Sequence, residues 1–204
     1  LGLLSLSDRI VPAMIDQTDN RLAEAARLLA TGQSERALAM TRALLKARPG
    51  HPLTEAMLGL CLFAQGAFDQ ALELFEGLLR RNPDQIPLRF NAGLCALRED
   101  DEPRALAHLQ RVVALSPGHR RALASLALLN LRNGQRYVAR DLLERAGLRD
   151  LAVQVNEASE AEMVLNLAVK LEDQALALHP AMDAIQPSPD EGFAEIAPPN
   201  TESS

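Results

Sequence analysis

The sequence predicts an all-α protein, a solenoid of about four helix-turn-helix repeats closed by a C-terminal capping helix. Two observations lead to this fold class. The first is an interval of 34 residues, which separates Pro49, Pro83 and Pro117 and indicates a stacked repeating unit. The second is composition: 3% of the residues are aromatic and there is no tryptophan, while alanine, leucine, arginine and glutamate dominate, a balance that favours helices over strands.

Small residues recur at the same interval and mark the parts of each repeat. The alanines are Ala37, Ala71, Ala105 and Ala139, and the glycines are Gly32, Gly66 and Gly134, with Asp100 at the remaining glycine position. Glycine ends the first helix of a repeat because it adopts the left-handed conformation without a clash. Proline stops the second helix. The alanine lets the two helices of a repeat approach closely, and a larger side chain would overpack the contact.

With these positions the chain resembles the tetratricopeptide repeat family. The second copy carries the resemblance most fully, at Leu58, Gly59, Leu62, Gly66, Phe68, Ala71, Phe75 and Pro83. The resemblance covers residues 18–150 and implies a right-handed α-solenoid. The chain departs from the family pattern in lacking a tryptophan at the start of any copy, in Asp100, and in Leu151 where a proline would stand.

The predicted domain organisation follows from the repeat and from the composition of the ends. The four repeats are 18–51, 52–85, 86–119 and 120–150; residues 1–17 form a partial cap, 151–179 form C-terminal capping helices and 180–204 a disordered acidic tail. Apolar residues recur along one side of 160–178, which predicts a helix that seals the open end of the stack. The tail holds five of the twelve prolines and a net charge of -5, a composition typical of disorder.

Composition and charge place the chain among soluble proteins. The net charge is -6, and no apolar run approaches the roughly 20 residues that a membrane-spanning helix needs, so we expect no membrane insertion. A cytoplasmic location is expected, although the numbering starts at Leu1 and leaves a removed export signal open. Cys61 and Cys95 occupy equivalent positions in adjacent copies, roughly 8 to 10 Å apart, which is too far for a disulfide.

No enzyme motif stands out, so we expect neither catalysis, nor a cofactor, nor a metal site. The four histidines lack metal-ligand spacing. They are expected on surfaces or in loops.

The family resemblance implies a concave groove, lined by the first helix of every repeat, that receives a helical or extended peptide. The corresponding residues are Leu22, Ala26, Leu29, Ala56, Leu60, Phe63, Phe90, Leu94, Leu97, Ala124, Leu128 and Leu131. This lining is apolar. One alternative stays open, in which the lining is covered by the N-terminal segment of the chain or by a second copy, because an exposed apolar strip of this length promotes aggregation.

Arginines gather in the fourth copy and form a second candidate surface. They include Arg120, Arg121, Arg132, Arg136 and Arg140. Such a cluster is a candidate site for an anionic partner, or else a solvated helix face. The overall acidity and the lack of neighbouring aromatic residues argue against nucleic acid. A third hypothesis is that the acidic tail around residues 190–196 folds back onto this basic end.

The sequence therefore predicts a non-enzymatic scaffold or adaptor that binds a segment of another protein. Two alternatives are a chaperone that holds an apolar client, as in type III secretion, and a self-associating assembly protein. A mass that depends on concentration would favour self-association over a separate partner.

Overall fold

The computed structural model describes residues 20–157, and within this range every regular element is an α-helix. The first helix spans residues 20–30. The helices that follow are α2 (Ser34–Ala47), α3 (Pro52–Ala64), α4 (Phe68–Arg81), α5 (Ile86–Arg98), α6 (Glu102–Leu115), α7 (Arg120–Arg132), α8 (Arg136–Arg145) and α9 (Arg149–Glu157).

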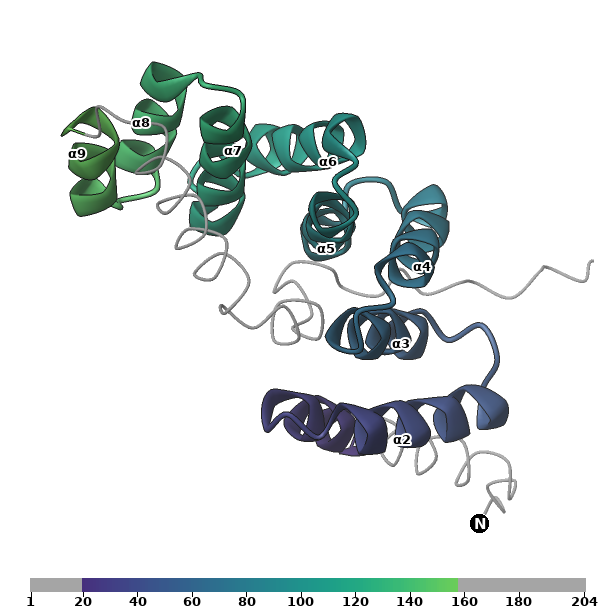
Figure 1. The fold of residues 1–204 in the computed structure, drawn as a ribbon. Helices are drawn as coiled ribbons and strands as arrows, with labels where there is room; N and C mark the ends of the chain where they lie inside the picture. The colour runs from purple at the N-terminus through teal and green to yellow at the C-terminus, as the bar shows by residue number, and fades with distance from the viewer. Residues whose placement is uncertain (1–19, 158–204) are drawn as a thin grey trace, which may run out of the picture.

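The helices form a curved stack in chain order (Figure 1). From α2 to α9, each helix packs on the one before it and the one after it. The first helices of successive repeats, α3, α5 and α7, lie on the inner side of the curve, and α4 and α6 lie on the outer side. The predicted all-α solenoid is confirmed, and α9 adds a further helix after the α7–α8 pair. The predicted cap 1–17, the tail 180–204 and most of the capping segment 151–179 lie outside the described residues.

The turn at Gly66 shows how the sequence ends the first helix of a repeat. Gly66 has a φ of 77°, which a glycine adopts without strain. Its N–H donates to the Phe63 carbonyl at 3.0 Å, and the Ala67 N–H donates to the Leu62 carbonyl at 2.9 Å, so that carbonyls at the helix end are satisfied. Asp100 takes the same role in the third copy with a φ of 53°, which is uncommon outside glycine but tolerated by aspartate.

Close contact between paired helices depends on small residues in both. The four alanines at the 34-residue interval are fully buried. Two glycines in the first helices face large residues of the second: a Cβ on Gly59 would lie 2.7 Å from Cζ of Phe75, and a Cβ on Gly93 would lie 2.9 Å from Cγ of Leu109. At these points the backbone of the first helix contacts a side chain of the second helix, and there is no room for a methyl group between them.

Two clusters of buried side chains make up the hydrophobic core, and they meet in α3. The smaller cluster joins residues 20–30 and α2 to Met57 and Cys61 of α3. The larger one runs from Ala56 to Val155 and includes Leu60 on the same helix. Because α3 contributes to both, the core continues along the stack from the first repeat to α9.

Candidate interaction surface

The inner faces of α3, α5 and α7 carry a leucine at equivalent positions 34 residues apart. These leucines, Leu60, Leu94 and Leu128, are called the leucine row below. On α5, Leu94 follows Gly93, which faces α6, and one residue turns a helix by about 100°. Leu94 therefore points away from that contact. On the same helix side, Arg98 four positions after it is exposed and Pro87 seven positions before it is half-buried, whereas Phe90 four positions before it is 1% exposed.

The same arrangement holds in the flanking repeats. On α3 the residue seven positions before the leucine, Leu53, is 43% exposed, and Ala64 four positions after it is exposed. On α7 the corresponding residues are Arg121 and Arg132. On each of the three helices, the side that carries the leucine is therefore exposed or half-buried near both ends of the helix. Arginines occupy these end positions on α5 and α7.

The predicted groove residues are more buried than an open groove requires. Nine of the twelve, all except Ala26, Leu29 and Phe63, have at most 6% exposure. The three exceptions are half-buried. All of these nine except Ala124 belong to the two clusters of the hydrophobic core.

The two predicted groove phenylalanines, Phe63 and Phe90, each contact a ring at the start of another helix. The Phe90 ring lies 4.9 Å from the His119 ring and 4.6 Å below the Arg121 guanidinium, so it fills the contact between α5 and the start of α7. The Phe63 ring meets the Phe68 ring edge-on at 5.1 Å.

The five predicted patch arginines do not act as one surface. Arg120 donates from Nε to the Ala146 carbonyl at 2.8 Å and so ties the start of α7 to the end of α8. Helix ends leave carbonyls without intrahelical partners, and an arginine satisfies one here. Its role is structural, which corrects the expected anion-binding role of this residue.

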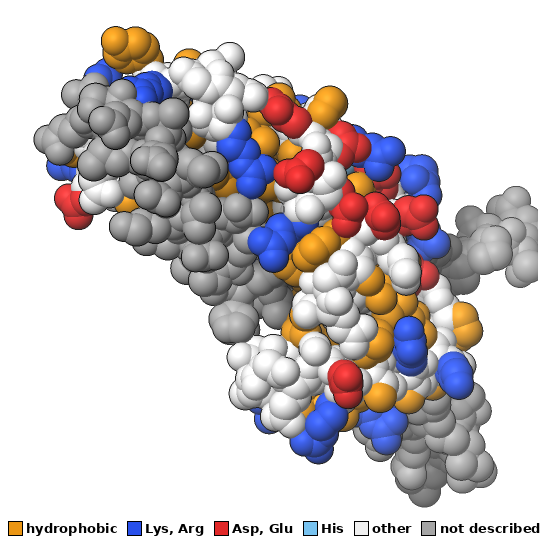
Figure 2. Space-filling model, in the orientation of Figure 1, with side chains coloured by type: hydrophobic (Ala, Val, Ile, Leu, Met, Phe, Trp, Pro, Cys, Tyr) orange, Lys and Arg blue, Asp and Glu red, His pale blue; other side chains and the backbone are white. Residues whose placement is uncertain are grey.

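The remaining four arginines lie on different parts of α7 and α8. Arg132 pairs with Asp100 at 3.2 Å. Arg140 pairs with Glu144 at 3.6 Å. Arg121 lies over Phe90 on the inner side, and Arg136 is half-buried in the first turn of α8. Acidic and basic side chains also lie next to one another on the described surface in view (Figure 2), a pattern that does not favour a polyanion.

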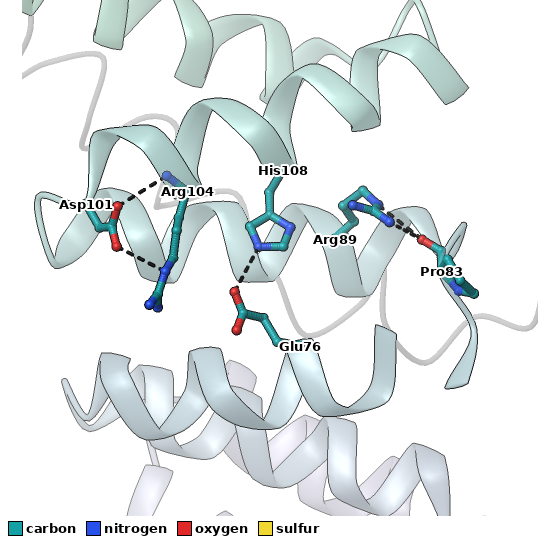
Figure 3. Close-up of polar contacts among 6 residues, drawn as sticks. All are labelled: Glu76, Pro83, Arg89, Asp101, Arg104 and His108. Atoms are coloured by element: carbon teal, nitrogen blue, oxygen red, sulfur yellow. Dashed lines mark hydrogen bonds and ion pairs between the residues drawn. The ribbon is translucent and has the colours of Figure 1, made fainter. Parts of the chain in front are cut away.

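One histidine makes a largely enclosed polar contact between two helices in the middle of the stack. His108 on α6 lies 3.3 Å from Glu76 on α4, with its side chain 13% exposed (Figure 3). Burial lowers the pKa of His108 from its usual 6.5, and Arg89 and Arg104 lower it further while Glu76 opposes them. The expectation of a surface or loop position is therefore wrong for this residue.

The neighbouring arginines are occupied by other groups. Arg104 pairs with Asp101 at 3.2 Å, and Arg89 donates from Nε to the Pro83 carbonyl at 3.1 Å (Figure 3). The other described histidines stand at helix starts: His51 contacts Thr54 at 2.8 Å, and Nδ1 of His119 accepts from the Ala122 N–H at 3.1 Å. Within residues 20–157 no group of histidine, cysteine and acidic side chains could hold a metal ion.

Both cysteines are free and buried, as their spacing predicts. Cys61 Sγ lies 3.8 Å from Thr41 Oγ1. Burial raises the pKa of both thiols, while the hydrogen bond between Cys61 and Thr41 acts in the opposite direction on the pKa of Cys61. Such thiols are poor nucleophiles and poor metal ligands because the thiolate is the reactive form.

Sequence reasoning missed two further features. Asn91 on α5 is 2% exposed, and its Nδ2 lacks a hydrogen-bond partner among the described residues. A polar residue inside a buried helix is the signal that could have identified it. The second feature is an open cavity of about 460 Å³ on the first repeat, lined by Arg21, Arg36, Ala39, Met40, Ala43 and Leu44.

Stacked helix pairs with an apolar inner face define an α-solenoid of the kind that mediates contacts between proteins. A family model described as tetratricopeptide repeat matches residues 28–89. The match lies within the region where the 34-residue interval predicts such repeats. No helix of the described part is long and apolar enough to cross a membrane.

Among curated proteins, the chain is 26% identical over 141 residues to "Protein CTR9 homolog" of Arabidopsis thaliana. The match covers 67% of this chain but 13% of that protein, so the chain corresponds to a small part of its length.

Solved structures establish the same fold. TTC0263, a thermophilic TPR protein of Thermus thermophilus, is 19% identical with a TM-score of 0.61, over 82% of this chain and 94% of that chain. YrrB, described as a TPR protein with an unusual peptide-binding site, is 19% identical with a TM-score of 0.55, over 86% of this chain and 95% of that one.

Proposed function

We propose that the chain is a non-enzymatic scaffold of the cytoplasm that binds an apolar segment of a partner protein along the inner faces of α3, α5 and α7. The observation that carries this proposal is the leucine row, with one leucine per repeat on the side that reaches solvent at its ends. The peptide-binding site named for YrrB belongs to that protein and supports the proposal by analogy of fold.

The chemistry of the face defines the partner. Burying an exposed leucine side chain contributes about 1.5 to 3 kcal/mol. Leu60, Leu94 and Leu128 are already at most 2% exposed, so the apolar side chains of α3 that remain available to a partner are Leu53, 43% exposed, and the half-buried Phe63. Arg98 on α5 and Arg121 and Arg132 on α7 bring positive charge to the ends of these sides, where Arg132 pairs with Asp100 at 3.2 Å and Arg121 lies over Phe90. The partner segment is therefore apolar along one side and carries acidic residues, in a helical or extended conformation.

The proposal is tested by capture of partners from the source cell with the full chain as bait. Arg98→Glu reverses the charge at the inner face, and Arg111→Glu makes the same change on α6, where Arg111 is exposed and pairs with Asp84 at 2.8 Å. We expect the first variant to lose a captured protein at least about tenfold and the second to keep it. Equal capture by both variants, with unchanged melting temperatures, would contradict the proposed site.

The mass of the full chain in solution tests the self-associating alternative. If the captured protein is the chain itself and its mass rises with concentration, the inner face joins copies of this chain and the proposal of a separate partner fails.

A further inference from the structure

The first repeat carries an open cavity formed by residues 20–30 and α2. Its volume is about 460 Å³, and Arg21 and Arg36 are the charged residues of its lining. The other lining residues are apolar: Ala39 and Ala43 are exposed, Met40 is half-buried and Leu44 is 4% exposed. The cavity therefore offers a free apolar surface beside two guanidinium groups.

The third copy shows what the equivalent face holds inside the stack. Three of the six lining positions recur 68 residues later as Arg89, His108 and Arg111. All three side chains contact α4 or the turn after it, two of them as drawn in Figure 3. Arg89 donates to the Pro83 carbonyl at 3.1 Å, His108 lies 3.3 Å from Glu76, and Arg111 pairs with Asp84 at 2.8 Å. In the third copy this face thus holds the second helix of the preceding repeat.

In the first copy the same face is open to a helix from elsewhere. The described chain begins with this repeat, so residues 20–157 place no helix of a preceding repeat on the cavity. Met40 and Ala43 occupy the positions at which the third copy has His108 and Arg111. A helix that fits here therefore offers apolar side chains at these two points.

Charge defines the rest of the occupant. Residues 20–48 contain six basic and two acidic residues, a formal charge of +4, whereas residues 49–157 contain thirteen of each. One of the two acidic residues, Glu24, pairs with Arg27 at 3.1 Å. The net positive charge of the described stack thus lies on its first repeat, and Figure 2 shows basic side chains gathered at the end of the view where α2 lies. Charge complementarity favours an acidic occupant.

The two arginines of the cavity are available to carboxylates of that occupant. Nη1 of Arg36 donates to Oε1 of the neutral Gln33 at 2.5 Å, whereas the equivalent Arg104 pairs with Asp101 at 3.2 Å. Arg21 makes no ion pair within the described residues. Both guanidinium groups therefore keep a positive charge that no carboxylate of the described chain neutralises.

We infer that the cavity of the first repeat binds an acidic amphipathic helix of a partner protein, which continues the stack beyond residues 20–30. The apolar side of that helix contacts Met40 and Ala43, and its carboxylates pair with Arg21 and Arg36. This surface is separate from the inner face of the proposed function, so the two sites are tested independently.

Thiol labelling of the full chain shows whether the cavity is free. Ala39→Cys places a thiol in the cavity and Arg42→Cys places one at an exposed position of α2 outside it. After subtraction of the rate for the parent protein, we expect the two rates to agree within threefold at every protein concentration. Labelling at position 39 that is tenfold slower at every concentration shows cover by the chain itself, and slowing that grows with concentration shows a second copy. Either result overturns the inference.

Binding is measured with a synthetic probe, a fluorescent helical peptide of about 18 residues, a length at which an isolated helix can form. It carries leucine at every third or fourth position along one side and glutamate beside the leucines. One control peptide has the same residues in scrambled order, and another has lysine in place of glutamate. We expect the acidic helix to raise the fluorescence anisotropy on binding the full chain, and both controls to bind at least tenfold more weakly.

Charge reversals in the protein locate the bound peptide. We expect Arg36→Glu to weaken binding at least fivefold, and Arg42→Glu on α2 and Arg98→Glu on the inner face to change it less than twofold. Ala39→Asp, at an exposed position, repeats the test if Arg36→Glu lowers the melting temperature. Absence of binding to the parent protein, or equal weakening by Arg36→Glu and Arg42→Glu, overturns the inference. Weakening by Arg98→Glu alone also overturns it and assigns the peptide to the face of the proposed function.

Discussion

Gly59 of α3 and Phe75 of α4 meet so closely that a methyl group on the glycine would lie 2.7 Å from the ring. We expect Gly59→Ala to lower the free energy of unfolding by about 1 to 3 kcal/mol, because Phe75 is fully buried and has no space to move away. Urea denaturation of the two proteins measures the difference.

Gly77 on α4 supplies the control for this change. A Cβ there would have only ordinary contact, 3.5 Å from a terminal nitrogen of Arg80, and alanine is the better helix former by about 1 kcal/mol. Gly77→Ala should therefore stabilise the protein. A loss of stability equal to that of Gly59→Ala would show that the contact with Phe75 is not the cause.

Asp100 occupies the left-handed turn position with a φ of 53°. We expect Asp100→Gly to raise the free energy of unfolding by up to about 1 kcal/mol, since glycine adopts this conformation without strain. Asp100→Ala should lower it by about 1 to 2 kcal/mol. Thermal denaturation of the two variants measures both changes. The same measurement on Gly66→Ala tests whether the turns at Gly66 and Asp100 are equivalent.

The ion pair between Asp100 and Arg132 contributes little to this balance because the Asp100 side chain is 85% exposed. Should Asp100→Gly prove as destabilising as Asp100→Ala, the conformational argument fails and the ion pair carries the stability of the turn.

His108 makes the stability of the protein depend on pH. Burial lowers its pKa below the usual 6.5, so the unfolded state binds a proton more readily than the folded state does. The stability contributed by neutral His108 is complete above about pH 6.5 and is lost as the pH falls toward the lower pKa of the folded state. The midpoint of urea denaturation, measured from pH 8 to pH 5, should decrease in that direction.

The variant His108→Gln keeps a polar side chain beside Glu76 and removes the titration. It should flatten the decrease below pH 6.5, whereas His51→Gln, at the start of α3, should leave it as in the parent protein. Identical pH profiles for the parent and His108→Gln would rule out His108 as the group responsible.

The two cysteines should be unreactive in the folded protein. Burial raises the pKa of Cys61 and Cys95, so the thiols stay protonated at pH 8, and both are enclosed between helices. We expect a thiol reagent to label them at least about tenfold more slowly in buffer than in denaturant. Rapid labelling in buffer, with the helix content intact, would contradict the burial of these residues.

The sequence allowed the repeat unit to be predicted because its signals are local. The conformation at Gly66, the small size of Ala71 and the stop at Pro83 each depend on residues within one helix or turn, and Asp100 stands in the sequence as the replacement for a turn glycine. The 34-residue interval then determines which residues are equivalent, including the leucine row. These features follow from backbone preferences and from the approach of adjacent helices.

The residues that a given side chain contacts on other helices could not be predicted in the same way. Periodicity places Phe90 on an apolar side but does not show that His119 and Arg121 enclose it, and it does not show that Arg120 reaches Ala146. Likewise, the contact between His108 and Glu76 joins second helices of adjacent repeats, residues 32 positions apart. These contacts depend on how one repeat is rotated on the next, which no single repeat encodes.

The packing of each helix on its neighbours in chain order has a consequence for folding and for evolution. Because the helices from α2 to α9 pack mainly on their neighbours in chain order, ordering of this part can start in the middle of the stack and spread outward with little loop-closure entropy, as in a one-dimensional Ising chain. The first repeat, which meets the rest through α3, can then melt separately. Duplication of one 34-residue unit would lengthen the molecule without disturbing the contacts inside the others.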